Sequence, residues 1–216
     1  MKKEEIVEIR PIEIQKVSIR VVGDTPLIMH AWSEKAKREM LEKQMKITKT
    51  KSKTAKNPVE DFIRSMYWLT PMPTEMTQEG FEKAISNGAQ FGFPITAFKQ
   101  AAISAAFRMG WAKDKVSLRG AFFIDGDENQ MIRIYSDPPV MREDMVKIGM
   151  GTADIRYRGE FRNWYADMEI SYNVNGQYTI EQIINIINAG GYACGVGEWR
   201  PERDGQYGMF HVTATN

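Results

Sequence analysis

The chain has 216 residues, of which 43% are hydrophobic and 26% charged. It is long enough to bury a hydrophobic core that needs no disulfides or metal ions to be stable. Its single cysteine, Cys194, excludes an internal disulfide framework and a cysteine-based zinc site. The net charge of +1 says nothing about partners. The charged N-terminus lacks an apolar stretch, and no run of about 18 apolar residues occurs. We therefore expect a cytoplasmic protein that does not span a membrane, with a single domain over 1–216.

The first part of the chain predicts one strand followed by a large, basic, partly helical insertion. Residues 12–22 alternate between apolar and polar side chains, as a half-buried strand does. The insertion covers 31–92. Within it, Ser33 can cap a helix to about residue 47, and Asn57 followed by Pro58 predicts the start of a second helix. A third, short helix is expected over 77–86.

The middle of the chain predicts a helix and two strands. Thr96 is the expected N-cap of a helix over 96–109. The turn-forming residues 125–129 predict a hairpin between strands over 116–124 and 131–135. The next stretch, 136–158, has prolines and glycines without periodicity and predicts mostly loop.

The C-terminal part predicts a strand, a helix and a last strand. Residues 164–174 alternate clearly, which is the strongest strand signal in the chain. Isoleucines at helical spacing predict a helix over 180–189, with a capping box of Thr179 and Gln182 at its start. Gly190 and Gly191 are expected to end it, because glycine readily adopts the positive φ of a C-cap.

Without the insertion, the predicted order is β-α-β-β-α-β, which is typical of a ferredoxin-like α+β fold. Such a fold has an antiparallel sheet with both helices on one face and leaves the other face open. The exposed sheet face, or the loops beside it, is then available for binding.

Three stretches resemble the RAMP superfamily of CRISPR proteins. A glycine-rich loop, 190–208, lies between the last helix and the last strand, and Thr25-Pro26-Leu27 follows the first strand. Phe93 to Ala102 is similar to the helix start of these proteins, with Lys99 at the lysine position and Ile95 and Thr96 in place of the usual Gly and Ser. The resemblance implies a ferredoxin-like core and, for the backbone subunits, a CRISPR-like complex that polymerises along single-stranded RNA. A phage or mobile-element protein that borrowed the fold fits equally well.

A cluster of cations in the insertion is the first candidate site. Lysines interspersed with Ser and Thr, with few aromatics, suit contacts to phosphates and not to bases. The alternative is a solvated helix end and loop. The candidate phosphate contacts are Lys35, Lys37, Arg38, Lys43, Lys46, Lys49, Lys51, Lys53 and Lys56.

The glycine-rich loop is the second candidate site. Its backbone N–H groups can approach a phosphate closely, and its aromatic side chains offer stacking faces. It is not a nucleotide-binding P-loop, because no G-K-S/T follows. The alternative is a connection whose Trp packs on its own domain. The candidates here are Trp199, Arg200, Arg203 and Tyr207, to which we add Lys99, Arg156 and Arg158 from elsewhere in the chain.

Three functions remain open at this point. The leading hypothesis is a non-catalytic binder of single-stranded RNA or DNA that works as a homo-oligomer or filament, with no cofactor. The second is a metal-independent endoribonuclease that uses His30 as general acid or base. The third is a phage structural or inhibitory protein without nucleic acid. Two histidines and one cysteine offer little material for a zinc site, and a hairpin turn explains Asp125 and Asp127 better than a metal does.

Overall fold

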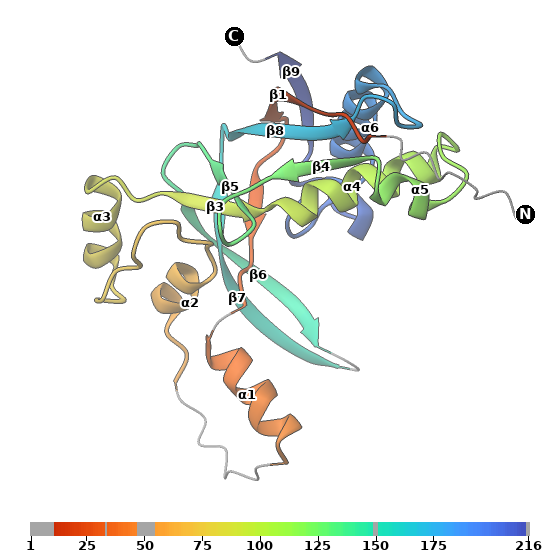
Figure 1. Cartoon of the computed structure of the whole chain (residues 1–216). Coiled ribbons are helices and arrows are strands. Elements are labelled where there is room, and N and C mark those ends of the chain that lie inside the picture. The colour runs from red at the N-terminus through yellow and green to blue at the C-terminus, as the bar shows by residue number, and fades with distance from the viewer. Residues whose placement is uncertain (1–10, 33, 47–54, 149–150, 215–216) are drawn as a thin grey trace, which may run out of the picture.

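The computed structural model describes residues 11–32, 34–46, 55–148 and 151–214. Figure 1 shows the arrangement of the elements, which are β1 (Ile14–Gly23), β2 (Leu27–Met29), α1 (Glu34–Gln44), α2 (Pro58–Arg64), α3 (Gln78–Ser86), β3 (Phe91–Pro94), α4 (Ile95–Arg108), α5 (Lys115–Arg119), β4 (Phe122–Asp125), β5 (Met131–Ile134), β6 (Val140–Ile148), β7 (Thr152–Phe161), β8 (Tyr165–Asn173), α6 (Ile180–Ala193) and β9 (Phe210–Ala214).

The largest sheet has four antiparallel strands in the order β4-β8-β1-β9. One face is apolar because Ile19 and Val21 alternate with polar residues and pair with apolar residues on neighbouring strands. Helices α4 and α6 pack against each other and cover this face, and the ring of Phe98 on α4 lies 5.6 Å from that of Phe210 on β9. The expected α+β class with an antiparallel sheet is confirmed.

Helix α6 does not end where its glycines predict. The capping box of Thr179 and Gln182 is present, but the helix continues through Gly190 and Gly191 to Ala193. A Cβ on Gly190 would lie 2.7 Å from the Cα of Ala102 on α4, and one on Gly191 would overlap the carbonyl oxygen of Phe210. These glycines therefore allow close packing, and the prediction that they stop the helix is wrong.

The connection from β4 to β8 carries a second insertion that the sequence does not predict. The expected hairpin over 116–135 is wrong, because 115–119 form α5 and β5 pairs with β3 instead of β4. The expected loop over 136–158 is also wrong, because β6 and β7 form a long hairpin there. Strand β2 adds to β7 and makes a three-stranded sheet.

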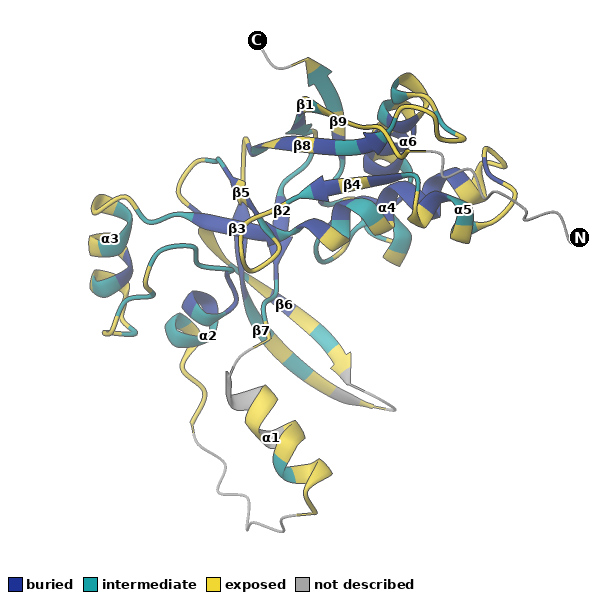
Figure 2. Cartoon of the chain, viewed as in Figure 1, coloured by how far each residue is buried: buried dark blue, intermediate teal, exposed yellow. Residues whose placement is uncertain are grey.

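The helices of the first insertion largely agree with the prediction. Asn57 caps α2 and Thr77 caps α3 through their side chains. Helix α4 begins one residue earlier than expected, after Pro94 instead of with Thr96 as cap. Helix α1 stands clear of the body of the described chain and, like the tip half of the β6–β7 hairpin, is mostly exposed (Figure 2).

The open face of the large sheet is covered by ion pairs. The ammonium of Lys16 lies 2.6 Å from carboxylate oxygens of both Asp125 and Glu169, and their hydrogen bonds raise the pKa of Lys16. Arg20 pairs with Asp167 at 2.7 Å. Since these cations are matched by carboxylates, the face offers no excess positive charge.

Among the described residues no helix combines the length and the apolar character that crossing a membrane requires.

Candidate nucleic-acid interface

A polar hollow of about 240 Å³ brings together stretches that the sequence analysis singled out separately. His30 comes from the end of β2, Thr96 and Gln100 come from the first turns of α4, and residues 195–198 and Arg200 come from the glycine-rich loop. Tyr67 also lines the hollow, although sequence reasoning missed it. It follows α2 in a segment with no chemical motif, so only the fold places it here.

Backbone hydrogen bonds close the glycine-rich loop onto β2. The amide of Glu198 donates to the carbonyl of Ile28 at 3.0 Å, and the amide of Gly208 donates to that of Pro26 at 2.8 Å. Val196 in turn donates to Gly208 at 2.9 Å. Gly208 has a φ of 65°, and a Cβ there would overlap the carbonyl oxygen of Val196. Glycine is therefore required for the loop to close.

Trp199 sits at the tip of this loop in a left-handed backbone conformation, with a φ of 52°. Its carbonyl accepts from the amide of Tyr207 at 3.0 Å, and the next carbonyl, of Arg200, accepts from Gly205 at 3.1 Å. The residue is 37% exposed. The loop thus holds a bulky aromatic residue, which is partly exposed, in an unfavourable backbone conformation at the surface.

The start of α4 forms one edge of the hollow, which Pro94, Thr96 and Ala97 line. Pro94 at the N-cap makes no side-chain capping bond, and the first turn contains no acidic residue. The amide of Ile95 is taken by the carbonyl of Gln130, at 3.0 Å. Positive helix ends favour anionic groups, so this edge of the hollow suits a phosphate or a carboxylate.

The charges in the hollow are largely matched. Nδ1 of His30 lies 3.7 Å from the Glu198 carboxylate, and the nearby His30, with the charges of Arg158 and Arg200, lowers the pKa of Glu198. Arg200 pairs with Glu202 at 3.1 Å and donates to the carbonyl of Gly197 at 2.9 Å.

A chain of alternating charges runs from the hollow along the base of the β6–β7 hairpin. Arg158 lies between Glu198, at 3.5 Å, and Asp144, at 3.1 Å. Arg142 then links Asp144, at 2.8 Å, to Glu160, at 3.0 Å. Because Arg158 is only 3% exposed and already shared between two carboxylates, we leave it out of the interface.

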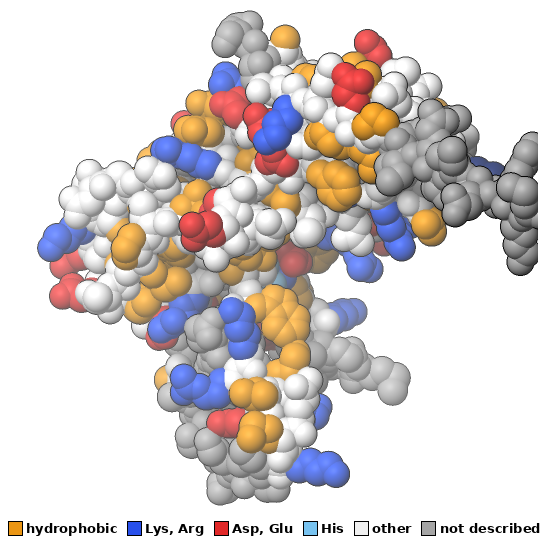
Figure 3. Space-filling model, viewed as in Figure 1, with side chains coloured by type: hydrophobic (Ala, Val, Ile, Leu, Met, Phe, Trp, Pro, Cys, Tyr) orange, Lys and Arg blue, Asp and Glu red, His pale blue; other side chains and the backbone are white. Residues whose placement is uncertain are grey.

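The cations of α1 lie on an exposed arm beside this region. Figure 3 shows Lys and Arg side chains gathered with hydrophobic ones on the part of the surface that α1 forms. Among the sequence candidates, Lys37, Arg38, Lys43 and Lys46 are exposed. Lys35 belongs to the first turn of α1. The candidates Lys49, Lys51 and Lys53 lie outside the described residues.

Three other sequence candidates are engaged in contacts of their own. Lys56 pairs with Asp154 at 2.7 Å and also donates to the carbonyl of Ile155 on the hairpin. Arg156 lies 3.6 Å from the same Asp154. The ring of Tyr207 lies under the guanidinium of Arg142, 4.5 Å from its carbon.

Lys99 is placed away from the hollow. Its ammonium lies 4.1 Å from the ring centre of Phe123, and burial lowers its pKa. Arg203, by contrast, is exposed on the glycine-rich loop, where Trp199 also lies. The structure therefore brings Trp199, Arg200 and Arg203 together and separates Lys99 from them.

The described residues contain no group of three or more His, Cys, Asp or Glu side chains placed to hold a metal ion. Asp127 stabilises the turn between β4 and β5, because its carboxylate accepts hydrogen bonds from the amides of Asn129 and Met131. No protein-family model matches the chain, and no curated protein shows significant sequence similarity to it.

Proposed function

We propose that this protein binds single-stranded nucleic acid, RNA or DNA, without cleaving it, and that it does so as an oligomer or filament in the cytoplasm. The observation that carries the proposal is Trp199: an exposed aromatic side chain on a backbone that only glycine adopts readily. Such strained residues cluster at ligand-binding sites, where the surrounding structure holds them in place.

The cost of the left-handed conformation is about 1–2 kcal/mol for a residue with a Cβ. Stacking a base on an aromatic face contributes about 1–3 kcal/mol, so the two magnitudes are comparable. Because Trp199 is 37% exposed, its packing on the protein leaves part of the residue uncovered. Stacking of a planar ligand such as a base on Trp199 would offset the cost of its left-handed backbone.

The charge for backbone contact would come from α1 and from Arg203. His30 lines the hollow together with residues of the glycine-rich loop, and α1 begins at Glu34, four residues later. The base of the α1 arm is therefore close to the glycine-rich loop. A strand stacked on Trp199 can thus reach the exposed cations of the arm. The open sheet face is a poorer candidate, because its Lys16 and Arg20 are already matched by carboxylates.

We further propose that the four-stranded sheet with α4 and α6 is a ferredoxin-like core of the kind found in the RAMP superfamily. The chain order β1, α4, β4, β8, α6, β9 and the strand order β4-β8-β1-β9 support this proposal. The glycine-rich loop between α6 and β9, closed against the residues that follow β1, supports it as well.

The endoribonuclease alternative has less support. A general acid–base histidine needs a group within hydrogen-bond reach to orient it, and the closest carboxylate, Glu198, lies 3.7 Å from Nδ1 of His30. Tyr67 lines the hollow and is the candidate second group, but burial raises its pKa, and among the described residues no second histidine and no lysine line the hollow.

Fluorescence anisotropy with a labelled single-stranded oligonucleotide tests the proposal. We expect Trp199→Ala to weaken binding about tenfold or more, because the stacking face is lost. Phe123→Ala is the matched control, since Phe123 is a 55% exposed aromatic residue on β4, outside the hollow and the glycine-rich loop. Unchanged affinity in Trp199→Ala, or an equal loss in both variants, would contradict the proposal.

A further inference from the structure

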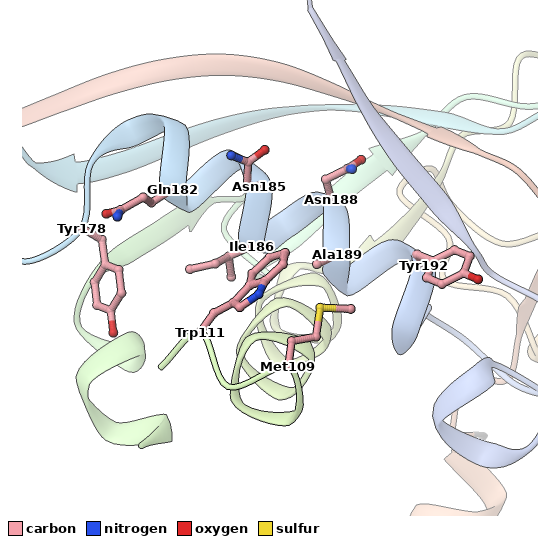
Figure 4. A pocket seen from close by; sticks show the side chains of 9 residues that line it. All are labelled: Met109, Trp111, Tyr178, Gln182, Asn185, Ile186, Asn188, Ala189 and Tyr192. Carbon is pink, nitrogen blue, oxygen red and sulfur yellow. The ribbon is translucent and has the colours of Figure 1, made fainter. Parts of the chain in front are cut away.

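A groove of about 660 Å³ lies between α6 and the end of α4 (Figure 4). The buried residues Ile186 and Ala189 on α6 form its floor, and Met109 and Trp111, which follow α4, lie on one side of it. None of the described residues that line the groove is charged. Its surface is made of apolar, aromatic and amide groups, so it suits an uncharged ligand or an uncharged part of a larger one.

Two exposed aromatic side chains flank the groove. Trp111 is 52% exposed, and Tyr192, on the last turn of α6, is 72% exposed. Figure 4 shows Tyr192 at one end of the groove and Trp111 nearer its middle. An exposed aromatic ring offers a face on which any base can stack, because every base has a π-face.

Three amide side chains line the groove from α6. Gln182, Asn185 and Asn188 follow one another at intervals of three residues, along the side of the groove opposite Trp111 (Figure 4). The oxygen of Gln182 accepts from the amide of Thr179 at 3.0 Å, and that of Asn188 accepts from the amide of Val212 at 2.8 Å. The side chain of Asn185 makes no hydrogen bond to another described residue. It therefore presents a free donor and a free acceptor side by side, as the edge of a base does.

The groove reaches the glycine-rich loop at its Tyr192 end. The guanidinium of Arg108, at the end of α4, donates to the carboxylate of Glu202 at 3.2 Å, and the amide of Glu202 donates to the carbonyl of Cys194 at 3.1 Å. Tyr192 precedes Cys194 by two residues, and Trp199 precedes Glu202 by three. Both exposed rings thus lie within three residues of the same contact, so one single strand can pass from one ring to the other.

We infer that the groove binds a base of the same single strand that stacks on Trp199. Trp111 and Tyr192 supply the stacking faces, and Asn185 bonds the edge of the base. The inference rests on the proposed function and adds a second contact for its ligand. Because no cation lines the groove, this contact raises the affinity without adding to its salt dependence.

Photo-crosslinking of the wild-type chain tests the inference without a variant that has to fold. The probe is a single-stranded oligonucleotide of about 15 nucleotides, within the usual range of site sizes, in which bromouracil replaces every second base. We expect crosslinked peptides that contain Trp111 or Tyr192, together with peptides that contain Trp199. Crosslinks at Trp199 alone would overturn the inference and leave the proposed function intact. An oligonucleotide that neither binds nor crosslinks would overturn both.

Affinities of variants for the same oligonucleotide give a second test. Trp111→Ala and Tyr192→Ala should each weaken binding about tenfold, as the loss of one stacked base does, and should leave the slope of log K against log salt unchanged. Phe123→Ala is the control, because Phe123 is 55% exposed and lies outside the groove. All three side chains are exposed, so we expect the melting temperature of the wild type. Groove variants that bind as tightly as the control would contradict the inference, whatever the affinity of Trp199→Ala.

Asn185→Ala tests the contact to the edge of the base. We expect the wild type to distinguish oligoadenylate from oligouridylate, and Asn185→Ala to reduce the ratio of the two affinities, since a side-chain amide pairs differently with each base. Asn129→Ala is the control, because Asn129 is exposed on the turn between β4 and β5. An equal ratio in the wild type and in Asn185→Ala would show that this amide does not contact a base.

Discussion

Trp199 and Gly191 show which properties of a single residue can be predicted from the sequence and which cannot. The aromatic and basic side chains of the glycine-rich loop were predictable as an exposed group, because Trp199, Arg203 and the glycines are close in the chain. The left-handed backbone of Trp199 was not predictable, because it depends on hydrogen bonds from Tyr207 to Trp199 and from Gly205 to Arg200 that form only when the loop closes.

The glycines of α6 show the opposite error. Local preference makes Gly190 and Gly191 a helix stop, but tertiary packing overrides it, because α4 and β9 approach α6 too closely for a side chain. The distance from α6 to α4 and β9 cannot be derived from a single sequence. It becomes visible only when α4, α6 and β9 are placed together.

Gly191→Ala should reverse the usual effect of this substitution. In an ordinary helix interior alanine is about 0.5–1 kcal/mol more favourable than glycine. Here the added methyl overlaps the carbonyl oxygen of Phe210, and we expect a net loss of about 1–3 kcal/mol, as for overpacked cores. Urea denaturation measures the difference. Gly120→Ala is the control, because no atom lies within 4 Å of the new Cβ; a stabilised Gly191→Ala would contradict the packing described for α6.

At the scale of elements, the long β6–β7 hairpin is the main failure of prediction, and it has a physical cause. Strand prediction relies on an apolar side chain at every second position. On this hairpin Phe161 and Gly159 are buried at its base, but so are Asp144, Arg158 and Glu160, which are held by ion pairs. Part of the hairpin therefore buries charged side chains where strand prediction looks for apolar ones. In contrast, β8 buries Ala166, Met168 and Ile170, and was predicted.

The ion pairs at the base of the hairpin give a test of this explanation. Arg158→Met leaves Asp144 and Glu198 without one of their buried partners, and breaking such a pair costs about 3–5 kcal/mol. Arg162→Met is the matched control: Arg162 also pairs with a buried carboxylate, Glu160, but its side chain is 61% exposed, so we expect a loss of no more than about 1 kcal/mol. Equal melting temperatures for the two variants would show that the charge chain does not hold the hairpin.

At the scale of the whole molecule, the order of the core elements was predictable and the way the insertions pair was not. Periodicity and caps are local, so the strand at 164–174 and the helices at 58–64, 78–86, 95–108 and 180–193 follow from short stretches. The pairing of β3 with β5 and of β2 with β7 joins segments far apart in the chain. No pattern within either segment specifies its partner. The hollow depends on this pairing, which explains why Tyr67 was missed.

The salt dependence of binding to a single-stranded oligonucleotide tests the central claim most directly. If the exposed cations Lys37, Arg38, Lys43 and Lys46 neutralise phosphates, each contributes about −0.7 to the slope of log K against log salt, which gives roughly −3 for the four. Changing all four to Gln should remove most of this slope, whereas changing the exposed Lys83 on α3 to Gln should leave it unaltered. We predict tight binding at low salt that falls steeply as salt rises. No binding at low salt, or binding that salt does not weaken, would contradict the account.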